Sequence, residues 1–300
     1  MKVFVTGATG AIGRFVLPQL VAAGHEVTAL ARSEEKAAQL RAQGATPVEV
    51  SLYDCEALTA AFAGHDAVAN LATAIPPMKK AGSKGAWVEN HRIRTEGSAA
   101  VADAAIAAGV GRLVQESITI QYVDGGDELL DEDTALLGEG TVATTATAEE
   151  NARRHPSAVV LRFALFYGPG SEQTEVMAGF ARRHIGPVVG KPSGYISSIH
   201  LADAASAVVA ALTAPAGTYN VVDDEPLTKK EWARALGAAV GKRPWLLLPG
   251  RWGKLGGKQT GPLTRSQRVS NRRLRDATGW EPKHPSVRDG FATLGDVPHG

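Results

Sequence analysis

Three glycines near the start of the chain have the spacing of a phosphate-binding turn. They occur as Gly7-x-x-Gly10-x-x-Gly13, between a β-branched run that predicts a strand and an apolar run that predicts a helix. In such a turn the first glycine permits the tight bend, the second lets a pyrophosphate approach the backbone, and the third lets the helix pack closely on the strand. The helix N-terminus then offers N–H groups and a partial positive charge to the phosphates. The residues between the glycines that we assign to the same dinucleotide site are Thr9, Ala11 and Ile12.

The end of the second predicted strand indicates which dinucleotide binds. A site for NAD usually places a carboxylate here, which accepts hydrogen bonds from the ribose hydroxyls of the adenosine half. This chain has Ala31, Arg32 and Ser33 instead. A guanidinium can pair with a ribose 2′-phosphate, and a serine hydroxyl can donate to it. The sequence therefore favours NADP as the cofactor, with NAD as the weaker alternative.

Alternating strand-like and helix-like segments predict the fold class. This alternation implies an α/β fold: a Rossmann-type doubly wound parallel sheet with helices on both faces and a smaller C-terminal substrate lobe. We expect residues 1–167 to form the dinucleotide-binding domain, with 196–223 returning to it, and residues 168–195 and 224–300 to form the substrate-binding lobe. The expected strands are residues 2–6, 26–31, 46–50, 67–71, 112–117, 158–163 and 218–222, and the expected helices are residues 12–23, 34–43, 56–62, 88–108, 146–154 and 228–240. The last helix begins with a capping-box spacing from Thr228 to Glu231.

Composition and charge exclude several other classes of protein. The formal net charge is +1 over 300 residues, so nothing global indicates a nucleic-acid partner or an anionic membrane surface. Cys55 is the only cysteine, which excludes an intrachain disulfide, and the histidines and carboxylates show no metal-ligand spacing, so we predict no metal. The chain runs directly into its first strand and contains no long apolar run. We therefore expect a cytoplasmic protein without a signal peptide or membrane span.

Charge is nevertheless uneven along the chain. Residues 124–139 contain seven carboxylates and no base, and residues 251–275 contain eight Lys or Arg residues, among them Arg265, and no acid. Two interpretations remain open: two solvated surface segments, or a basic segment that meets an anionic ligand or the acidic loop.

Several motifs together resemble the short-chain dehydrogenase/reductase superfamily, in its extended or atypical, NAD-dependent epimerase/dehydratase-like branch. Besides the glycine turn, these motifs are the runs at residues 66–72, 161–170, 199–205 and 219–222, and they span nearly the whole chain. The resemblance implies a nucleotide domain, a C-terminal lobe, and a pocket between them for a small-molecule substrate. The further cofactor-binding residues that we assign through it are Leu52, Leu71, Ala72, Thr73, Asn90, Arg94 and Ser117.

The resemblance also implies a catalytic set of a Ser or Thr, a Tyr and a Lys. In this superfamily the hydroxyl binds the substrate oxygen, the Tyr exchanges a proton with it, and the Lys binds the ribose and lowers the pKa of the Tyr. Ser117 ends the fifth expected strand, where that hydroxyl lies, and Thr119 is a second hydroxyl nearby.

The Tyr and Lys of this set are missing from the sequence. Their positions fall on Thr141 and Thr145, or on Val142 and Ala146 after a shift of one residue. Neither alignment restores the pair, and no Lys, Arg or His occurs between residues 115 and 151. Arg94 is a further departure, because many relatives carry Asn there.

An apparently complete cofactor turn without the usual proton donor leaves three functions open. The first is an NADP-dependent oxidoreductase for a small carbonyl or hydroxyl substrate, with a relocated acid: Tyr122 first, Tyr195 second, then His200 or substrate-bound water. Tyr122 comes first because it follows the fifth strand at the edge of the sheet where active-site groups gather. The others are a non-redox enzyme, a lyase or isomerase, that keeps the cofactor as a scaffold, and a dinucleotide-sensing regulatory protein without turnover. We expect a monomer or a homodimer.

Overall fold

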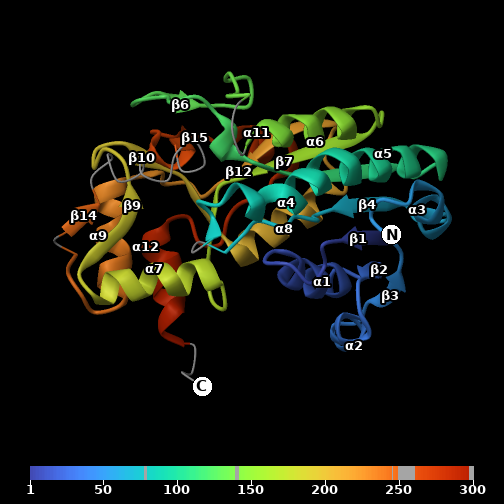
Figure 1. The fold of residues 1–300 in the computed structure, drawn as a ribbon, viewed down its shortest axis with the longest axis horizontal. Helices are drawn as coiled ribbons and strands as arrows, with labels where there is room; N and C mark the ends of the chain where they lie inside the picture. Colours follow the sequence, from blue (N-terminus) through green and yellow to red (C-terminus); the bar gives the residue numbers. More distant parts are fainter. Residues whose placement is uncertain (78–79, 139–141, 245, 249–260, 297–300) are drawn as a thin grey trace.

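The computed structural model describes residues 1–77, 80–138, 142–244, 246–248 and 261–296. Seven parallel strands form one sheet in the order β3-β2-β1-β4-β5-β7-β12 (Figure 1), which confirms the Rossmann-type expectation. The order reverses between β1 and β4, and ligands of open α/β sheets bind at the C-terminal ends of strands at such a point. The strands are β1 (Lys2–Thr6), β2 (Glu26–Ala31), β3 (Thr46–Glu49), β4 (Ala67–Asn70), β5 (Arg112–Ile118), β7 (Ala158–Phe163) and β12 (Gly217–Val221).

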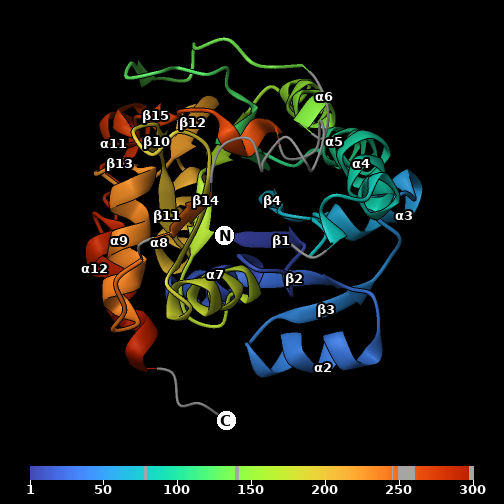
Figure 2. The same ribbon diagram turned by 60° about the vertical axis from the view of Figure 1, so that its left-hand side comes forward.

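Two hydrophobic cores hold helices against the two faces of this sheet. Side chains alternate along a strand, so Val5 faces the first core and Phe4 the second. Figure 2 shows α2 on one side of the strands and α5 and α6 on the other. The first core involves α1 (Gly13–Ala22), α2 (Glu34–Ala42) and α8 (Leu201–Ala211), and the second involves α3 (Cys55–Phe62), α5 (Ser98–Ala107) and α6 (Ala143–Arg153).

The expected helix over residues 88–108 is present as a helical segment from 88 to 107, but a π-helical turn interrupts its α-helical geometry. The segment consists of α4 (Val88–Arg92), a π-helical turn η3 (Ile93–Gly97) and α5. Hydroxyls interfere with the helical ladder here: the Thr95 side chain donates to the His91 carbonyl at 2.9 Å, and Ser98 donates to the Arg94 carbonyl at 2.7 Å. Such π-turns occur frequently at functional sites.

A smaller lobe lies beside one end of the sheet, at the left of Figure 1. Its own core surrounds Trp232 and Phe291. The capping box from Thr228 to Glu231 is confirmed at the start of α9. The elements of this lobe are α7 (Glu172–Arg182), β9 (Ile185–Val189), β10 (Tyr195–Ile196), β13 (Leu227–Thr228), α9 (Lys229–Ala239), β14 (Leu246–Leu248), α12 (Val287–Gly290) and η8 (Phe291–Asp296). The division of the chain into domains remains a prediction.

Short elements connect the sheet with this lobe. The pair β8 and β11 and the pair β6 and β15 are each parallel and two-stranded. The connecting elements are β6 (Leu129–Leu130), β8 (Leu165–Tyr167), β11 (Ser198–His200), β15 (Arg268–Val269), α11 (Arg272–Thr278), η4 (Thr119–Gln121) and η7 (Gly261–Thr264), whereas η2 (Lys84–Trp87) lies between β4 and α4. In the part of the chain that the structure describes, no helix has the length and apolar content needed to cross a bilayer.

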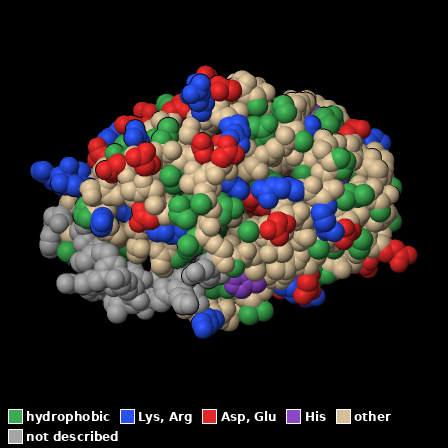
Figure 3. All heavy atoms as spheres, turned by 90° about the horizontal axis from the view of Figure 1, so that it is seen from above, with side chains coloured by type: hydrophobic (Ala, Val, Ile, Leu, Met, Phe, Trp, Pro, Cys, Tyr) green, Lys and Arg blue, Asp and Glu red, His purple; other side chains and the backbone are tan. Residues whose placement is uncertain are grey.

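The acidic and basic segments of the sequence meet in the fold, as one of the two interpretations predicted. Strand β6 of the acidic segment pairs with β15 of the basic one. Arg273 lies 3.4 Å from Glu132 and 2.5 Å from Asp133. Figure 3 shows basic and acidic side chains interspersed over the described residues of one face of the molecule.

Candidate functional site

The glycine turn follows β1, and two of its glycines are required by the backbone. Gly7 has φ +68°, and a Cβ there would lie 2.5 Å from the backbone carbon of Leu71 at the end of β4. A Cβ at Gly13 would lie 2.4 Å from the Gly7 oxygen. The predicted tight bend is therefore confirmed, and at Gly13 the start of the helix packs closely on the backbone of Gly7 and Ala8 in the turn. At Gly10 the nearest heavy atom to a Cβ is the Gly7 oxygen at 3.1 Å, so the fold itself crowds this position least.

The start of α1 leaves room and hydrogen-bond donors for an anion. Ile12 is its N-cap, and no side chain caps this helix end. The first N–H groups of a helix have no partner within the helix, so those of the turn can donate to phosphate oxygens. Thr9 is half-buried, and Gly10 and Ala11 are exposed. The turn has space that only glycines leave open, and it lies next to a helix end that no side chain caps. Both features fit the pyrophosphate of a dinucleotide.

The adenosine end of the predicted site carries an accessible positive charge. Arg32 is exposed, and no carboxylate lies within ion-pair distance of it among the described residues. Ser33 caps α2 by accepting from the Lys36 N–H at 3.3 Å, which leaves its own hydroxyl hydrogen free to donate. Leu52 lies half-buried after β3, where a Cβ at Gly97 would come 3.0 Å from its Cδ2.

A ladder of buried amides and hydroxyls ties together the ends of three strands. Thr6 donates to Asn70 Oδ1 at 2.5 Å, and Asn70 Nδ2 donates to Gln115 Oε1 at 2.8 Å. Just beyond β4, Asn90 accepts from the Ala74 N–H at 3.1 Å, which places it beside the predicted cofactor residues Leu71, Ala72 and Thr73. The strand ends that flank the glycine turn are therefore held in fixed register.

A buried ion pair lies beside the C-terminal end of β5. Arg94 Nη2 lies 3.0 and 3.1 Å from the two carboxylate oxygens of Glu116, and Arg94 Nη1 donates to Thr145 Oγ1. Burial raises the pKa of Glu116, and the Arg94 charge opposes that rise. The sequence predicts Arg94 at the cofactor site, whereas its partner Glu116 was not among the predicted residues. The signal was available, since a carboxylate inside an otherwise buried parallel strand needs a partner.

Ser117 faces a different buried network, which corrects its predicted role as a substrate-binding hydroxyl. Its Oγ donates to Glu149 Oε1 at 2.5 Å and accepts from Gln121 Nε2 at 3.0 Å. Arg162 donates to both oxygens of the same carboxylate at 2.8 and 2.7 Å. Burial alone would raise the pKa of Glu149, but the hydrogen bonds and charge of Arg162 outweigh it and lower the pKa to about 2. The Ser117 side chain is fully buried, so its hydroxyl holds the network instead of facing a ligand.

Tyr122 is also committed elsewhere, which argues against it as the relocated acid. Its hydroxyl donates to Asn220 Oδ1 at 2.7 Å and accepts from Arg162 Nη1 at 2.9 Å. Burial raises its pKa to about 12 against the opposing charge of Arg162. Because the ring is 0% exposed and its proton is already shared, the phenol cannot reach a substrate in this conformation.

The catalytic roles of Thr119 and Tyr195 remain predictions. Thr119 is buried at the start of η4, directly after β5, and its hydroxyl has no hydrogen-bond partner among the described residues. Tyr195 is half-buried in β10, where the guanidinium of Arg268 lies 5.3 Å from its ring centroid. Thr141, the position expected for the superfamily's Tyr, lies outside the described residues.

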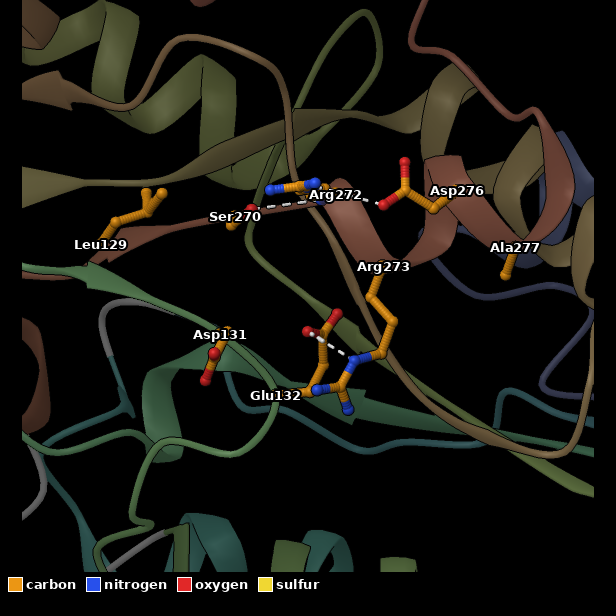
Figure 4. A pocket seen from close by; sticks show the side chains of 8 residues that line it. All are labelled: Leu129, Asp131, Glu132, Ser270, Arg272, Arg273, Asp276 and Ala277. Carbon is orange, nitrogen blue, oxygen red and sulfur yellow. Dashed lines mark hydrogen bonds and ion pairs between the residues drawn. The ribbon is translucent and has the colours of Figure 1, made fainter.

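A hollow of about 590 Å³ lies where the acidic and basic segments meet, away from the glycine turn (Figure 4). Its charges are largely matched: Arg273 lies 3.4 Å from Glu132, and Arg272 lies 3.3 Å from Asp276. Internally paired charges leave little to attract an anionic ligand, so we place the candidate site at the strand ends. The lining residues are Leu129, Asp131, Glu132, Ser270, Arg272, Arg273, Asp276 and Ala277.

His200 acts as a helix cap, so the structure does not favour it as the relocated acid. Its Nδ1 accepts from the Ala202 N–H at 3.2 Å, at the start of α8. Asp203 accepts from the backbone N–H groups of Lys283 and His284 at 3.0 and 2.9 Å. The ligand atoms of His200, Asp203 and His284 lie within 4.8 Å of one another. Because these atoms already serve the fold, the cluster gives no reason to expect a metal.

Comparison with known protein families and with curated proteins gives consistent matches. Residues 7–215 match a family model described as NAD(P)H-binding. A 3-diazoavenalumate denitrifying reductase from a Streptomyces species is 35% identical over 97% of this chain and 99% of its own length. A 2-alkyl-3-oxoalkanoate reductase from Stenotrophomonas maltophilia is 32% identical over 80% of this chain and 76% of its own length.

Solved structures show the same fold. The human epimerase family protein SDR39U1, solved with NADPH, is 25% identical with a TM-score of 0.84, over 99% of this chain and 100% of its own. The UDP-glucose 4-epimerase of Thermus thermophilus, solved with NAD, has a TM-score of 0.76 at 23% identity, over 99% and 100% of the two chains.

Proposed function

The chain belongs to the NAD(P)H-binding family of the short-chain dehydrogenase/reductase superfamily and is an NAD(P)-dependent oxidoreductase, and we propose that it is an NADPH-dependent reductase of a small carboxylate substrate. The observation that carries this proposal is a glycine turn shaped for a dinucleotide, next to strand ends that lack the Tyr–Lys proton donor. The cofactor, the absent donor and the substrate class each constrain the reaction.

The cofactor residues fit NADPH in their shape and their charge. Gly7 and Gly13 set the turn, and the open face at Gly10 takes the pyrophosphate. Arg32 pairs with the 2′-phosphate, since it is exposed and lacks a carboxylate partner in the described chain. When bound, NADPH supplies a hydride from its nicotinamide ring.

The missing proton donor favours a substrate whose reduction leaves no oxygen to protonate. A ketone becomes an alkoxide when it accepts a hydride, and it then needs an acid. A carbon that carries a diazonium group needs none. The C–H bond forms with the hydride pair, the C–N bond breaks toward nitrogen, and R–N₂⁺ plus NADPH gives R–H, N₂ and NADP⁺. The Streptomyces reductase is named for a diazo substrate and for denitrification, so we propose a carboxylate that carries a diazonium group as the substrate of this chain.

Arg265 is placed to hold the carboxylate of such a substrate. It donates to the Ile120 carbonyl at 3.1 Å and to the Tyr122 carbonyl, directly beyond the C-terminal end of β5. No carboxylate lies within ion-pair distance of Arg265 among the described residues. Burial lowers the pKa of its guanidinium, but the ordinary pKa of arginine is so high that the group stays charged. A half-buried guanidinium with spare N–H donors is suited to a carboxylate. Thr119 lies in the same loop and offers its hydroxyl to the substrate.

A second candidate is the reduction of a 3-oxo carboxylate. It is favoured by the similarity to the 2-alkyl-3-oxoalkanoate reductase. In that reaction Thr119 would donate a hydrogen bond to the substrate oxygen, and water would supply the proton.

Deuterium transfer distinguishes the two candidates. The protein is incubated with NADPH deuterated at the transferable position and with either a carboxylate that carries a diazonium group or a 3-oxo carboxylate, and products are analysed by mass spectrometry. We expect the diazonium compound to lose N₂ and gain one deuterium at the former diazonium carbon. Turnover of the ketone alone would select the second candidate, and oxidation of NADPH by neither compound would overturn the proposal.

Two substitutions test the carboxylate site. Arg265→Gln is expected to raise KM about tenfold or more with little change in NADPH affinity, since a charge-assisted hydrogen bond is lost. Arg272→Gln is the matched control, because that side chain is 85% exposed and pairs with Asp276. Equal KM values for the two variants would remove Arg265 from the site.

A further inference from the structure

The guanidinium of Arg94 lies where the structure offers a bound dinucleotide a second fixed cation. We propose that Arg94 contacts the nicotinamide-side ribose of NADPH and supplies the positive charge that α6, with Thr145 at the expected lysine position, does not. The charge thus comes from the π-helical turn η3 on a different part of the chain. This inference rests on NADPH as the cofactor but not on the identity of the reduced substrate.

The hydrogen bonds of Arg94 leave donors available. A guanidinium carries five N–H donors. Nη2 serves the two Glu116 oxygens, and Nη1 serves Thr145. One N–H on Nη1 remains, and Nε is buried without a partner among the described residues. A buried donor without a partner costs free energy, so the fold does not fully satisfy this guanidinium, and the remaining Nη1 N–H is the donor that a bound ligand would use.

The position of Arg94 matches the path of the cofactor. Asn90, one turn earlier on α4, holds the segment that follows β4, and Glu116 belongs to the end of β5. The glycine turn follows β1, the neighbour of β4 on its other side. We place the adenosine half of the dinucleotide at Arg32, beside β2, and its pyrophosphate at the turn after β1. Its nicotinamide half then lies over the ends of β4 and β5.

Stability alone does not explain this ion pair. The side chains of Arg94 and Glu116 are 3% and 4% exposed, and burying two charges costs several kcal/mol of desolvation for each. Their mutual attraction often does no more than offset that cost. A pair held at the cofactor edge with spare donors is instead suited to bind a polar ligand.

The competing explanation is that the cluster of Arg94, Glu116 and Thr145 only fastens α6 to β5. A measurement of NADPH affinity distinguishes this explanation from the proposal. The variants are the double variant Arg94→Gln/Glu116→Gln and the charge transfer Arg94→Asn/Thr145→Lys. The double variant removes the cation without leaving a buried carboxylate unpaired, so it is expected to fold. Arg92→Gln is the control, since it removes an exposed charge two residues away that pairs with Glu96. NADPH affinity is measured by calorimetry without substrate, and thermal unfolding is measured alongside.

We expect Arg92→Gln to bind NADPH within about threefold of the parent. Arg94→Gln/Glu116→Gln is expected to bind about tenfold or more weakly, the size of a lost charge-assisted hydrogen bond. The lysine of Arg94→Asn/Thr145→Lys is expected to recover most of that loss. Unchanged affinity in the Arg94→Gln/Glu116→Gln variant, with only a lower Tm, would overturn the proposal. It would not affect the assignment of the substrate, which the deuterium experiment tests separately.

Discussion

His200 makes the folded protein sensitive to mild acid. Its Nδ1 accepts the Ala202 N–H that caps α8, and its ring stacks on His284 with centroids 3.9 Å apart. Burial lowers its pKa from 6.5 to about 4, with the His284 charge acting in the same direction and Asp203 opposing both. Protonation would also remove the acceptor that caps the helix, since in the neutral ring the proton belongs on Nε2.

The sign and size of the effect follow from the two pKa values. The unfolded chain protonates His200 first on acidification, so stability is fully present above pH 6.5 and is lost as the pH falls toward 4. Each pKa unit corresponds to about 1.4 kcal/mol, which gives a loss of about 3 kcal/mol across this window. The lowered pKa of Glu149 acts in a more acidic window, between 4.5 and about 2.

Urea unfolding of the parent and of His200→Asn, at several pH values from about 8 to 4.5, measures this contribution. Asparagine can still cap the helix but does not titrate here. We expect the variant to be less stable at pH 8, because packing is lost, and to show a flatter dependence on pH. Parallel curves for the two proteins between pH 6.5 and 4.5 would refute the reasoning.

Four further substitutions test the site and its surroundings. Gly10→Val is expected to abolish NADPH binding in calorimetry while the circular dichroism spectrum is unchanged, because the fold leaves space at this position that the pyrophosphate needs; normal binding by the folded variant would place the cofactor elsewhere. Arg32→Ala is expected to lower the preference for NADPH over NADH about tenfold to a hundredfold, and an unchanged affinity ratio would contradict the pairing with the 2′-phosphate. Tyr122→Phe is expected to keep kcat but to lose about 1–3 kcal/mol of unfolding free energy, whereas a hundredfold loss of turnover would restore it as the proton donor. Asp223→Asn is expected to raise Tm at neutral pH, since both carboxylate oxygens are buried without partners in the described chain and burial raises the pKa; a lower Tm would reveal a partner for the charge.

The fold was predictable because its signals are local. Each strand of the main sheet and the helices that cover it follow from short runs of residue types, and Gly7 and Gly13 are required by contacts within a few residues or with the adjacent strand. The segment over residues 88–108 could not be predicted as three pieces. Its π-helical turn depends on which carbonyls the hydroxyls of Thr95 and Ser98 bond, and helical periodicity does not encode this.

The site was predictable only where a residue acts through its backbone or its place in a turn. The predicted roles of Ser117 and Tyr122 are not supported, because both side chains point toward buried partners. Ser117 lies at the expected strand end, but its hydroxyl is taken by Glu149, 32 residues later in the chain. Tyr122 is held by Asn220, 98 residues away. Pairings over such separations leave no periodic pattern in a single sequence.

Neighbouring residues of β5 explain how the site departs from the superfamily pattern. Glu116 and Ser117 hold different partners: Glu116 binds Arg94, and Ser117 binds Glu149. Arg94 without Glu116 would be a buried unpaired charge, and so would Glu116 without Arg94, so neither residue is tolerable alone. Thr145, at the position expected for the lysine, accepts a hydrogen bond from Arg94, so the absent Tyr–Lys pair and the buried ion pair meet at one place in the fold. We therefore infer that both belong to one reductase site, in which a fixed charge contacts the cofactor and no phenol protonates the product.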